Sequence, residues 1–96
     1  MKIAIASLGK DSNAEISPQA GRAPYYLIFE NNEFIETWKN VFSIGGGGAG
    51  LAIAKIMADK NVEKIISSNF GEKMKNALNV KNIDFEEKIG IVKDSL

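Results

Sequence analysis

The chain has 96 residues, balances twelve basic against twelve acidic side chains, and contains no cysteine and no histidine. The balanced charge argues against a nucleic-acid-binding protein, which normally carries a basic excess on one face. The missing residue types exclude disulfides, zinc sites of the Cys/His type and cysteine-ligated iron–sulfur sites, and they remove the commonest proton-transfer residue. A chain of this length predicts a single domain over residues 1–96. The lack of catalytic residue types indicates that it is not an enzyme. No apolar stretch is long enough for a signal segment or a membrane span, so we expect a cytoplasmic location.

The first part of the chain predicts three strands. Lys2–Ser7 is a short apolar run that is typical of a central strand covered on both faces. Leu8–Pro24 shows no periodicity and is too long for an ordinary connection, so it predicts a functional or mobile loop. Tyr25–Glu30 and Glu33–Lys39 are joined by an Asn-Asn pair, which predicts a tight turn and an antiparallel hairpin.

The second part predicts helices alternating with strands. Glycines within Val41–Gly50 interrupt the strand pattern, and Leu51–Lys60 then has the apolar spacing of an amphipathic helix. Asn61 is suited to the left-handed conformation that often ends a helix. Val62–Ser67 predicts the fourth strand.

The remaining residues predict a second helix and a last strand. Ser68 or Asn69 can cap a helix that runs from about Gly71 to Leu78. Ile83–Phe85 predicts a short fifth strand, and Glu86–Leu96 could form either a last helical turn or an irregular segment.

This order of elements predicts where a ligand would bind. Strands joined by a helix run parallel in one sheet, so only the second strand, within the hairpin, should be antiparallel. Four segments should then converge at one edge of the sheet, together with the starts of both helices: Ser7–Lys10, Gly21–Tyr25, Gly45–Gly50 and Ser67–Gly71. Open α/β sheets bind ligands at such an edge, where the strand order switches.

The glycine run is the first candidate contact. Gly45, Gly47 and Gly50 satisfy the spacing G-x-G-x-x-G, but the run follows the third strand rather than the first, which argues against a dinucleotide site. Glycines still let backbone N–H groups approach an anion at a helix start; the alternative is a plain flexible connection. The candidate ligand contacts of this run are Gly46, Gly47, Gly48 and Gly50.

Two further segments carry polar candidates. Arg22, in the segment Gly-Arg-Ala-Pro, can offer planar donors to an anion, or it can instead pair with Asp11 or Glu15 and pin the loop. Asn69 can turn toward a ligand or simply cap the second helix. The other candidate contacts at this edge are Ser7, Lys10, Gln19, Gly21, Ser68 and Gly71.

Four motifs in order resemble a known family. The chain contains K-I-A-I-A-S-x-G-K, G-R-A-P-Y-Y-L-I-F, G-G-A-G-L-A-I-A-K-I-M-A-D-K and S-N-F-G-E-K. Together they resemble the dinitrogenase iron–molybdenum cofactor biosynthesis family, the domain of NifX, NifY and the C-terminal part of NifB. The resemblance implies a ribonuclease-H-like motif with three layers, α/β/α, around a mixed five-stranded sheet of order 3-2-1-4-5 with strand 2 antiparallel.

The resemblance also implies a role in binding or carrying iron–molybdenum cofactor or its iron–sulfur precursors. Members of the family often carry His-Phe before the Gly-Arg-Ala-Pro segment, where this chain has Gln19 and Ala20. A glutamine amide is a poor metal ligand. We therefore expect any cluster to be preassembled, not ligated by cysteine or histidine, and held by backbone donors with Arg22 or Lys10.

Three functions remain open at this point. The first is a non-catalytic carrier of an anionic iron–molybdenum or iron–sulfur cofactor or its precursor. The second is a binding module for a small organic or phosphate-containing anion at the same edge. The third is an interaction domain whose exposed third strand and Trp38 pair with another protein or form a homodimer. We expect neither nucleic acid nor membrane as a partner.

Overall fold

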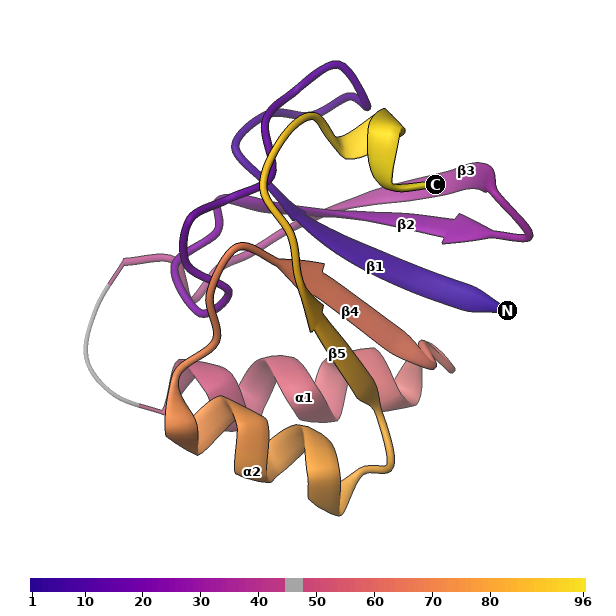
Figure 1. Ribbon diagram of the computed structural model, residues 1–96. Helices are drawn as coiled ribbons and strands as arrows, with labels where there is room; N and C mark the ends of the chain where they lie inside the picture. Colours follow the sequence, from indigo (N-terminus) through magenta and orange to yellow (C-terminus); the bar gives the residue numbers. More distant parts are fainter. Residues whose placement is uncertain (45–47) are drawn as a thin grey trace.

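The computed structural model describes residues 1–44 and 48–96. It forms one mixed sheet, a pair of helices and a short 3-10 helix, η1 (Figure 1). In chain order the elements are β1 (Lys2–Ser7), β2 (Tyr25–Glu30), β3 (Glu33–Lys39), α1 (Ala49–Asp59), β4 (Lys64–Ser67), α2 (Glu72–Val80), β5 (Asp84–Glu87) and η1 (Val92–Ser95).

The sheet has the predicted strand order, β3-β2-β1-β4-β5. β2 pairs antiparallel with both β1 and β3, while β1, β4 and β5 run parallel to one another. β1 thus lies at the centre of the sheet, where the antiparallel half meets the parallel half. The prediction of a mixed sheet with an antiparallel second strand is confirmed.

Both helices cover the same face of the sheet (Figure 1). Alternate residues of the central strands point toward them, among them Ala4, Ala6, Tyr26 and Ile65, and all four are buried in one apolar cluster with Met57. The small alanine side chains of β1 leave room for the helices to pack closely on the sheet.

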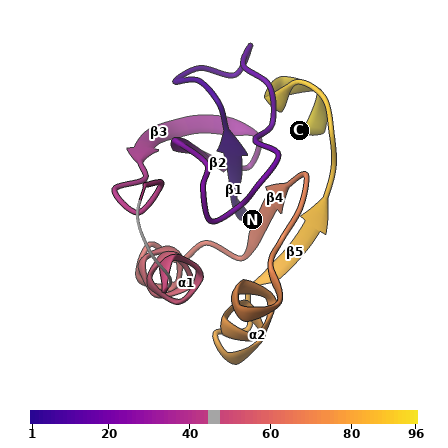
Figure 2. The same ribbon diagram turned by 90° about the vertical axis from the view of Figure 1, so that its left-hand side faces the viewer.

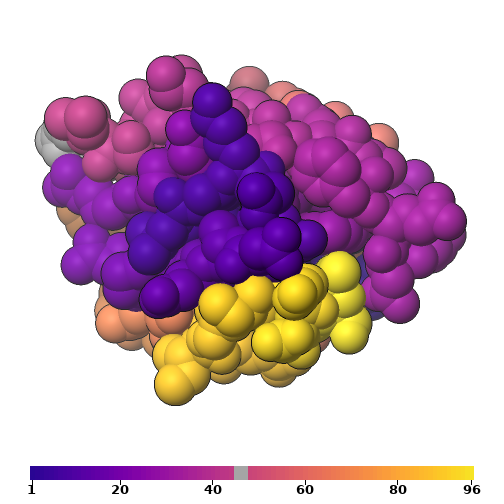
Figure 3. Space-filling view, turned by 90° about the horizontal axis from the view of Figure 1, so that it is seen from above, coloured from indigo at the N-terminus to yellow at the C-terminus, as the bar shows by residue number. Residues whose placement is uncertain are grey.

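The long loop and the C-terminal segment cover the opposite face of the sheet. Ile5, Leu27 and Ile66 point to this side and pack against Ile16 of the long loop and Val92 of η1. Figure 3 shows the long loop and the C-terminal segment side by side over this face. Hydrogen bonds join the two segments, from Ile16 N to Gly90 O, from Val92 N to Ala14 O and from Lys93 N to Ser12 O. The three expected layers are therefore present, but the layer on this face is formed by a loop and a 3-10 turn instead of α-helices.

The first three strands have the predicted bounds, and the later elements differ. β4 begins at Lys64 rather than Val62, and β5 spans Asp84–Glu87 rather than Ile83–Phe85. α1 begins at Ala49 rather than Leu51, because Gly48 adopts φ 91° and serves as its N-cap. The capping of α2 by Ser68 or Asn69 is wrong, since Gly71 is the N-cap and the helix begins at Glu72. The tail, ambiguous in sequence, ends in the η1 turn.

Candidate functional site

A hollow of about 430 Å³ lies at the end of the sheet where the two helices begin. Figure 2 looks along both helices from this end. The hollow is lined by the long loop, by the start of α1, and by the β4–α2 connection with the first turn of α2. Its lining residues are Gln19, Ala20, Gly21, Arg22, Gly48, Ala49, Gly50, Asn69, Gly71, Lys73 and Met74.

Both helix starts are open toward ligands. Neither N-cap, Gly48 or Gly71, makes a side-chain capping hydrogen bond. The first amides bonded within the helices are those of Ala52, to Gly48 O, and of Lys75, to Gly71 O. Within residues 1–44 and 48–96, the earlier amides of each first turn have no protein acceptor. Such amides carry the partial positive charge of a helix start and are suited to bind an anion.

Close packing of the two helices brings these starts together. A Cβ atom built on Gly50 would lie 2.7 Å from the Cβ atom and 3.0 Å from the Cα atom of Met74. Only glycine therefore permits the first turns of α1 and α2 to approach so closely. As a result, the two sets of free amides border one hollow instead of two separate surfaces.

The side-chain charges around the hollow are positive. Arg22 and Lys73 line it, and no acidic residue belongs to its lining. Glu72, at the start of α2, is exposed and lies 3.7 Å from the ammonium group of Lys75. Within the described part of the chain, Arg22 makes no ion pair. The alternative in which Arg22 pins the loop to Asp11 or Glu15 is therefore not met.

The loop that carries Arg22 is held in place by hydrogen bonds. The hydroxyl of the fully buried Tyr26 donates a hydrogen bond to the carbonyl of Ala20. Burial raises the pKa of this hydroxyl, which keeps it protonated and able to donate. The amide of Ala20 in turn donates to Asn69 O at 3.0 Å, so the loop is joined to the β4–α2 connection.

The structure brings most of the predicted contacts together. Those that line the hollow are Gln19, Gly21, Arg22, Gly48, Gly50, Asn69 and Gly71. Gly46 and Gly47 lie outside the described residues. Sequence reasoning missed Lys73, although its position directly after the predicted start of a helix placed it near the same edge. It also missed Ala49 and Met74, which border the hollow because of the helix packing at Gly50.

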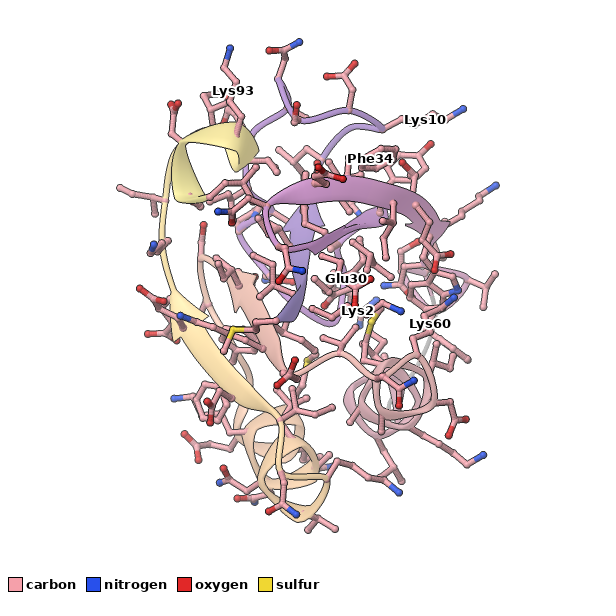
Figure 4. The ribbon with its side chains drawn as sticks, turned by 90° about the vertical axis from the view of Figure 1, so that its right-hand side faces the viewer. Lys2, Lys10, Glu30, Phe34, Lys60 and Lys93 are labelled. Carbon is pink, nitrogen blue, oxygen red and sulfur yellow. The ribbon has the colours of Figure 1, made fainter. Side chains whose placement is uncertain are left out.

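Three predicted contacts lie away from the hollow. The buried Ser7 pairs with Ile16, and its hydroxyl donates to Gly9 O at 2.8 Å. The ammonium group of Lys10 lies 5.9 Å from the ring centre of Tyr25, and its side chain points outward (Figure 4). The hydroxyl of Ser68 donates to Lys88 O at 3.1 Å. The expected convergence of Ser7–Lys10 on the site thus fails, because the strand-like bridge at Ile16 covers the end of β1.

The hollow offers hydrogen-bond donors rather than metal ligands. Across residues 1–44 and 48–96, no group of three or more His, Cys, Asp or Glu residues could hold a metal ion. Gln19 contributes a neutral amide to the lining. The arrangement is therefore suited to hold an anion by hydrogen bonds rather than to supply ligands to a metal ion.

Across residues 1–44 and 48–96, no helix is long and apolar enough to cross a membrane.

Comparisons with known proteins identify the family and the fold of the chain. The sequence model of the dinitrogenase iron-molybdenum cofactor family matches residues 1–95. A Thermotoga protein described as NifB-like and as a member of the DUF35 family has 26% identity and a TM-score of 0.82, over 98% of this chain and 82% of that one. The apo form of the orange protein from Desulfovibrio gigas has 20% identity and a TM-score of 0.89, with the same coverage. No curated protein matches the chain.

Proposed function

The chain belongs to the dinitrogenase iron-molybdenum cofactor family, and we propose that it is a non-catalytic carrier of an anionic metallocluster. The cargo is an iron–molybdenum or iron–sulfur cofactor, or a precursor of one. It would bind in the hollow between the long loop and the two helix starts.

One observation carries the proposal: two uncapped helix starts and two cationic side chains border a single hollow that no carboxylate lines. An uncapped helix start is stabilised by an anion, and two of them together favour a ligand with more than one negative charge. Arg22, from the long loop, and Lys73, from the first turn of α2, can add charge-assisted hydrogen bonds. The family supplies the chemical class of the anion.

The residues present favour contacts to the outside of a cluster. The chain has neither a thiolate nor an imidazole to offer, and Gln19 lies in the hollow where the resemblance places a histidine in other members. A cluster held here would keep its own ligands and would be bound through N–H donors and ammonium or guanidinium groups. Binding of this kind is electrostatic and weakens as salt increases.

The same donors also favour a second candidate, a small organic or phosphate-containing anion. Amides at helix starts also bind phosphate and carboxylate groups, so the residues that line the hollow do not select for a metal-containing anion. An interaction through the β3 edge, as a homodimer or with another protein, is less favoured. Trp38 is partly buried against Tyr26, with ring centres 6.0 Å apart, so it does not present an open aromatic surface.

Cluster loading tests the carrier proposal. Purified iron–molybdenum cofactor is added under argon, and gel filtration with visible absorption measures the chromophore that co-elutes with the protein. We expect co-elution with the unchanged chain and a loss of affinity of about tenfold or more in the double variant Arg22→Ala/Lys73→Ala, because two charge-assisted contacts are removed.

The matched control removes two charges elsewhere. Lys81→Ala/Lys93→Ala changes exposed lysines outside the hollow and should load like the unchanged chain. A chain that binds no chromophore while pyrophosphate raises its melting temperature would support the small-anion function instead. Equal loading of both double variants would remove the hollow from consideration.

A further inference from the structure

Asn40 is a buried polar residue that the binding proposal does not yet use. It follows β3 directly, and only 1% of its surface is exposed. Its side-chain amide nitrogen donates to Gly21 O at 3.2 Å and to Ala23 O at 2.8 Å. Its side-chain oxygen accepts from the amide of Phe42 at 2.9 Å. All the hydrogen-bonding groups of this amide face protein partners.

The two carbonyls that accept from Asn40 belong to Gly21 and Ala23, the residues immediately before and after Arg22 in the sequence. Both belong to the loop that lines the hollow, and each is fixed by one hydrogen of the same amide. The backbone amide of Asn40 also donates to Pro24 O at 3.0 Å. The carbonyls of the residues immediately before and after Arg22 are therefore held by one buried residue, while Arg22 itself stays exposed.

The other side of the amide holds the connection that leads toward α1. Phe42, whose amide donates to Asn40, packs partly buried against the core cluster beneath the helices. The amide of Ser43 donates to Asn40 O at 3.2 Å, which closes the turn. Asn40 thus joins the Arg22 loop to the segment that follows β3.

Only an asparagine amide fits this set of partners. Two carbonyls need donors and one N–H needs an acceptor, and an amide provides both kinds of group. A carboxylate of the same shape would place oxygen against two carbonyl oxygens. An alanine would leave two carbonyls and one N–H without a side-chain partner in a buried place, which costs stability for each group.

We propose that Asn40 is the positioning residue of the anion site, holding the loop so that Arg22 lines the hollow before any ligand arrives. Its contribution to affinity rests on the proposed function, since it acts through Arg22. A contact that is already in place spares the ligand the entropic cost of ordering the loop. Removing Asn40 should therefore weaken binding without changing the charge of the site.

The test combines a measurement without ligand and a measurement with ligand. In 15N-labelled protein, the heteronuclear NOE of the Arg22 and Ala23 amides reports how firmly the loop is held. We expect it to fall in Asn40→Ala and in Asn40→Asp, the second variant keeping an acceptor for Phe42. Val92→Ala is the control for general destabilisation, because Val92 is buried on the opposite face of the sheet, and it should leave both amides rigid.

The measurement with ligand is a double-mutant cycle using purified iron–molybdenum cofactor under argon. Asn40→Ala should bind about tenfold more weakly than the unchanged chain, and adding it to Arg22→Ala should cause little further loss, because both act through one contact. Rigid Arg22 and Ala23 amides in both Asn40 variants, or additive losses, would overturn the positioning role. A lack of cofactor binding by the unchanged chain would instead overturn the carrier function, and the NOE measurement would still decide whether Asn40 holds Arg22.

Discussion

At their C-terminal ends α1 and α2 are closed by the chain itself, whereas at their N-terminal ends neither helix has a side-chain cap. At the end of α1, the amide of Lys60 donates to Ile56 O, and the amide of Val62 donates back to Met57 O. Asn61 makes the sharp turn between them with φ 63°. Figure 4 views the molecule from this closed side, with Lys60 labelled beside α1.

The end of α2 repeats the arrangement. The amide of Lys81 donates to Ala77 O, the amide of Ile83 donates to Leu78 O, and Asn82 adopts φ 59°. Carbonyls in the last turn of each helix thus accept hydrogen bonds from the chain itself, while the first amides of both helices have no acceptor among the described residues. This contrast supports the proposal that the helix starts take part in ligand binding, because the same two helices show that the chain can satisfy a helix end internally.

The largest effect is expected where the two open starts meet. Gly50→Ala should lower the free energy of unfolding by about 2 kcal/mol, since the added methyl group overlaps Met74 and forces the helices apart. Urea unfolding measures the change. Gly21→Ala is the matched control, because its new Cβ atom would lie 4.0 Å from that of Ala49 in ordinary contact. A loss in Gly50→Ala no larger than in the control would contradict the close helix approach.

A smaller effect is expected at the closed ends. Asn61→Ala should cost about 1 kcal/mol of stability, because an alanine is strained in the left-handed conformation that Asn61 adopts. Asn61→Gly, which adopts this conformation freely, should cost nothing or stabilise the chain. Thermal and urea unfolding of the pair would measure the difference. Equal stabilities of the two variants would show that the turn does not depend on the left-handed residue.

A substitution at Gly71, the N-cap of α2, should change stability least but should clearly weaken binding. Gly71→Asp would give α2 the side-chain cap that it lacks, and should stabilise the chain by about 0.5 kcal/mol. The same carboxylate would accept hydrogen bonds from the first amides of α2 and offset their partial positive charge. The affinity for the cofactor should therefore fall. Gly71→Ser supplies a cap without charge and separates the two causes. Unchanged binding by both variants would show that the start of α2 takes no part in the site.

Local patterns were sufficient to predict most of the sheet. The first three strands lie where their apolar runs and the Asn-Asn turn placed them, and the parallel half follows from the handedness of strand–helix–strand connections. The third layer could not be predicted in this way. It depends on contacts between the loop at Ile16 and the turn at Val92, which are distant in sequence and show no periodicity.

The same limitation explains what was missed at the site. Lys10 carries a suitable charge, but Thr37 donates to its carbonyl at 2.9 Å and holds that part of the loop beside β3. Asn69 looked like a cap, yet its backbone carbonyl accepts from Ala20 and the helix begins later. Asn40 follows the third strand without any motif of its own, and only the folded chain shows that it joins the Arg22 loop to the segment at Phe42. These assignments depend on long-range hydrogen bonds that no local pattern encodes.

Because β1 lies at the centre of the sheet, the hollow can form only late in folding. β2 pairs with β1 soon after it along the chain, but β4 reaches β1 only after β3 and α1 have been passed. Contacts that close long stretches of chain form more slowly than local ones. Arg22 comes from the half of the sheet built by local contacts, and Gly50 and Lys73 come from the half that needs the long closure. A partly folded chain therefore has no complete hollow, and the carrier proposal implies that only fully folded molecules can bind the cluster.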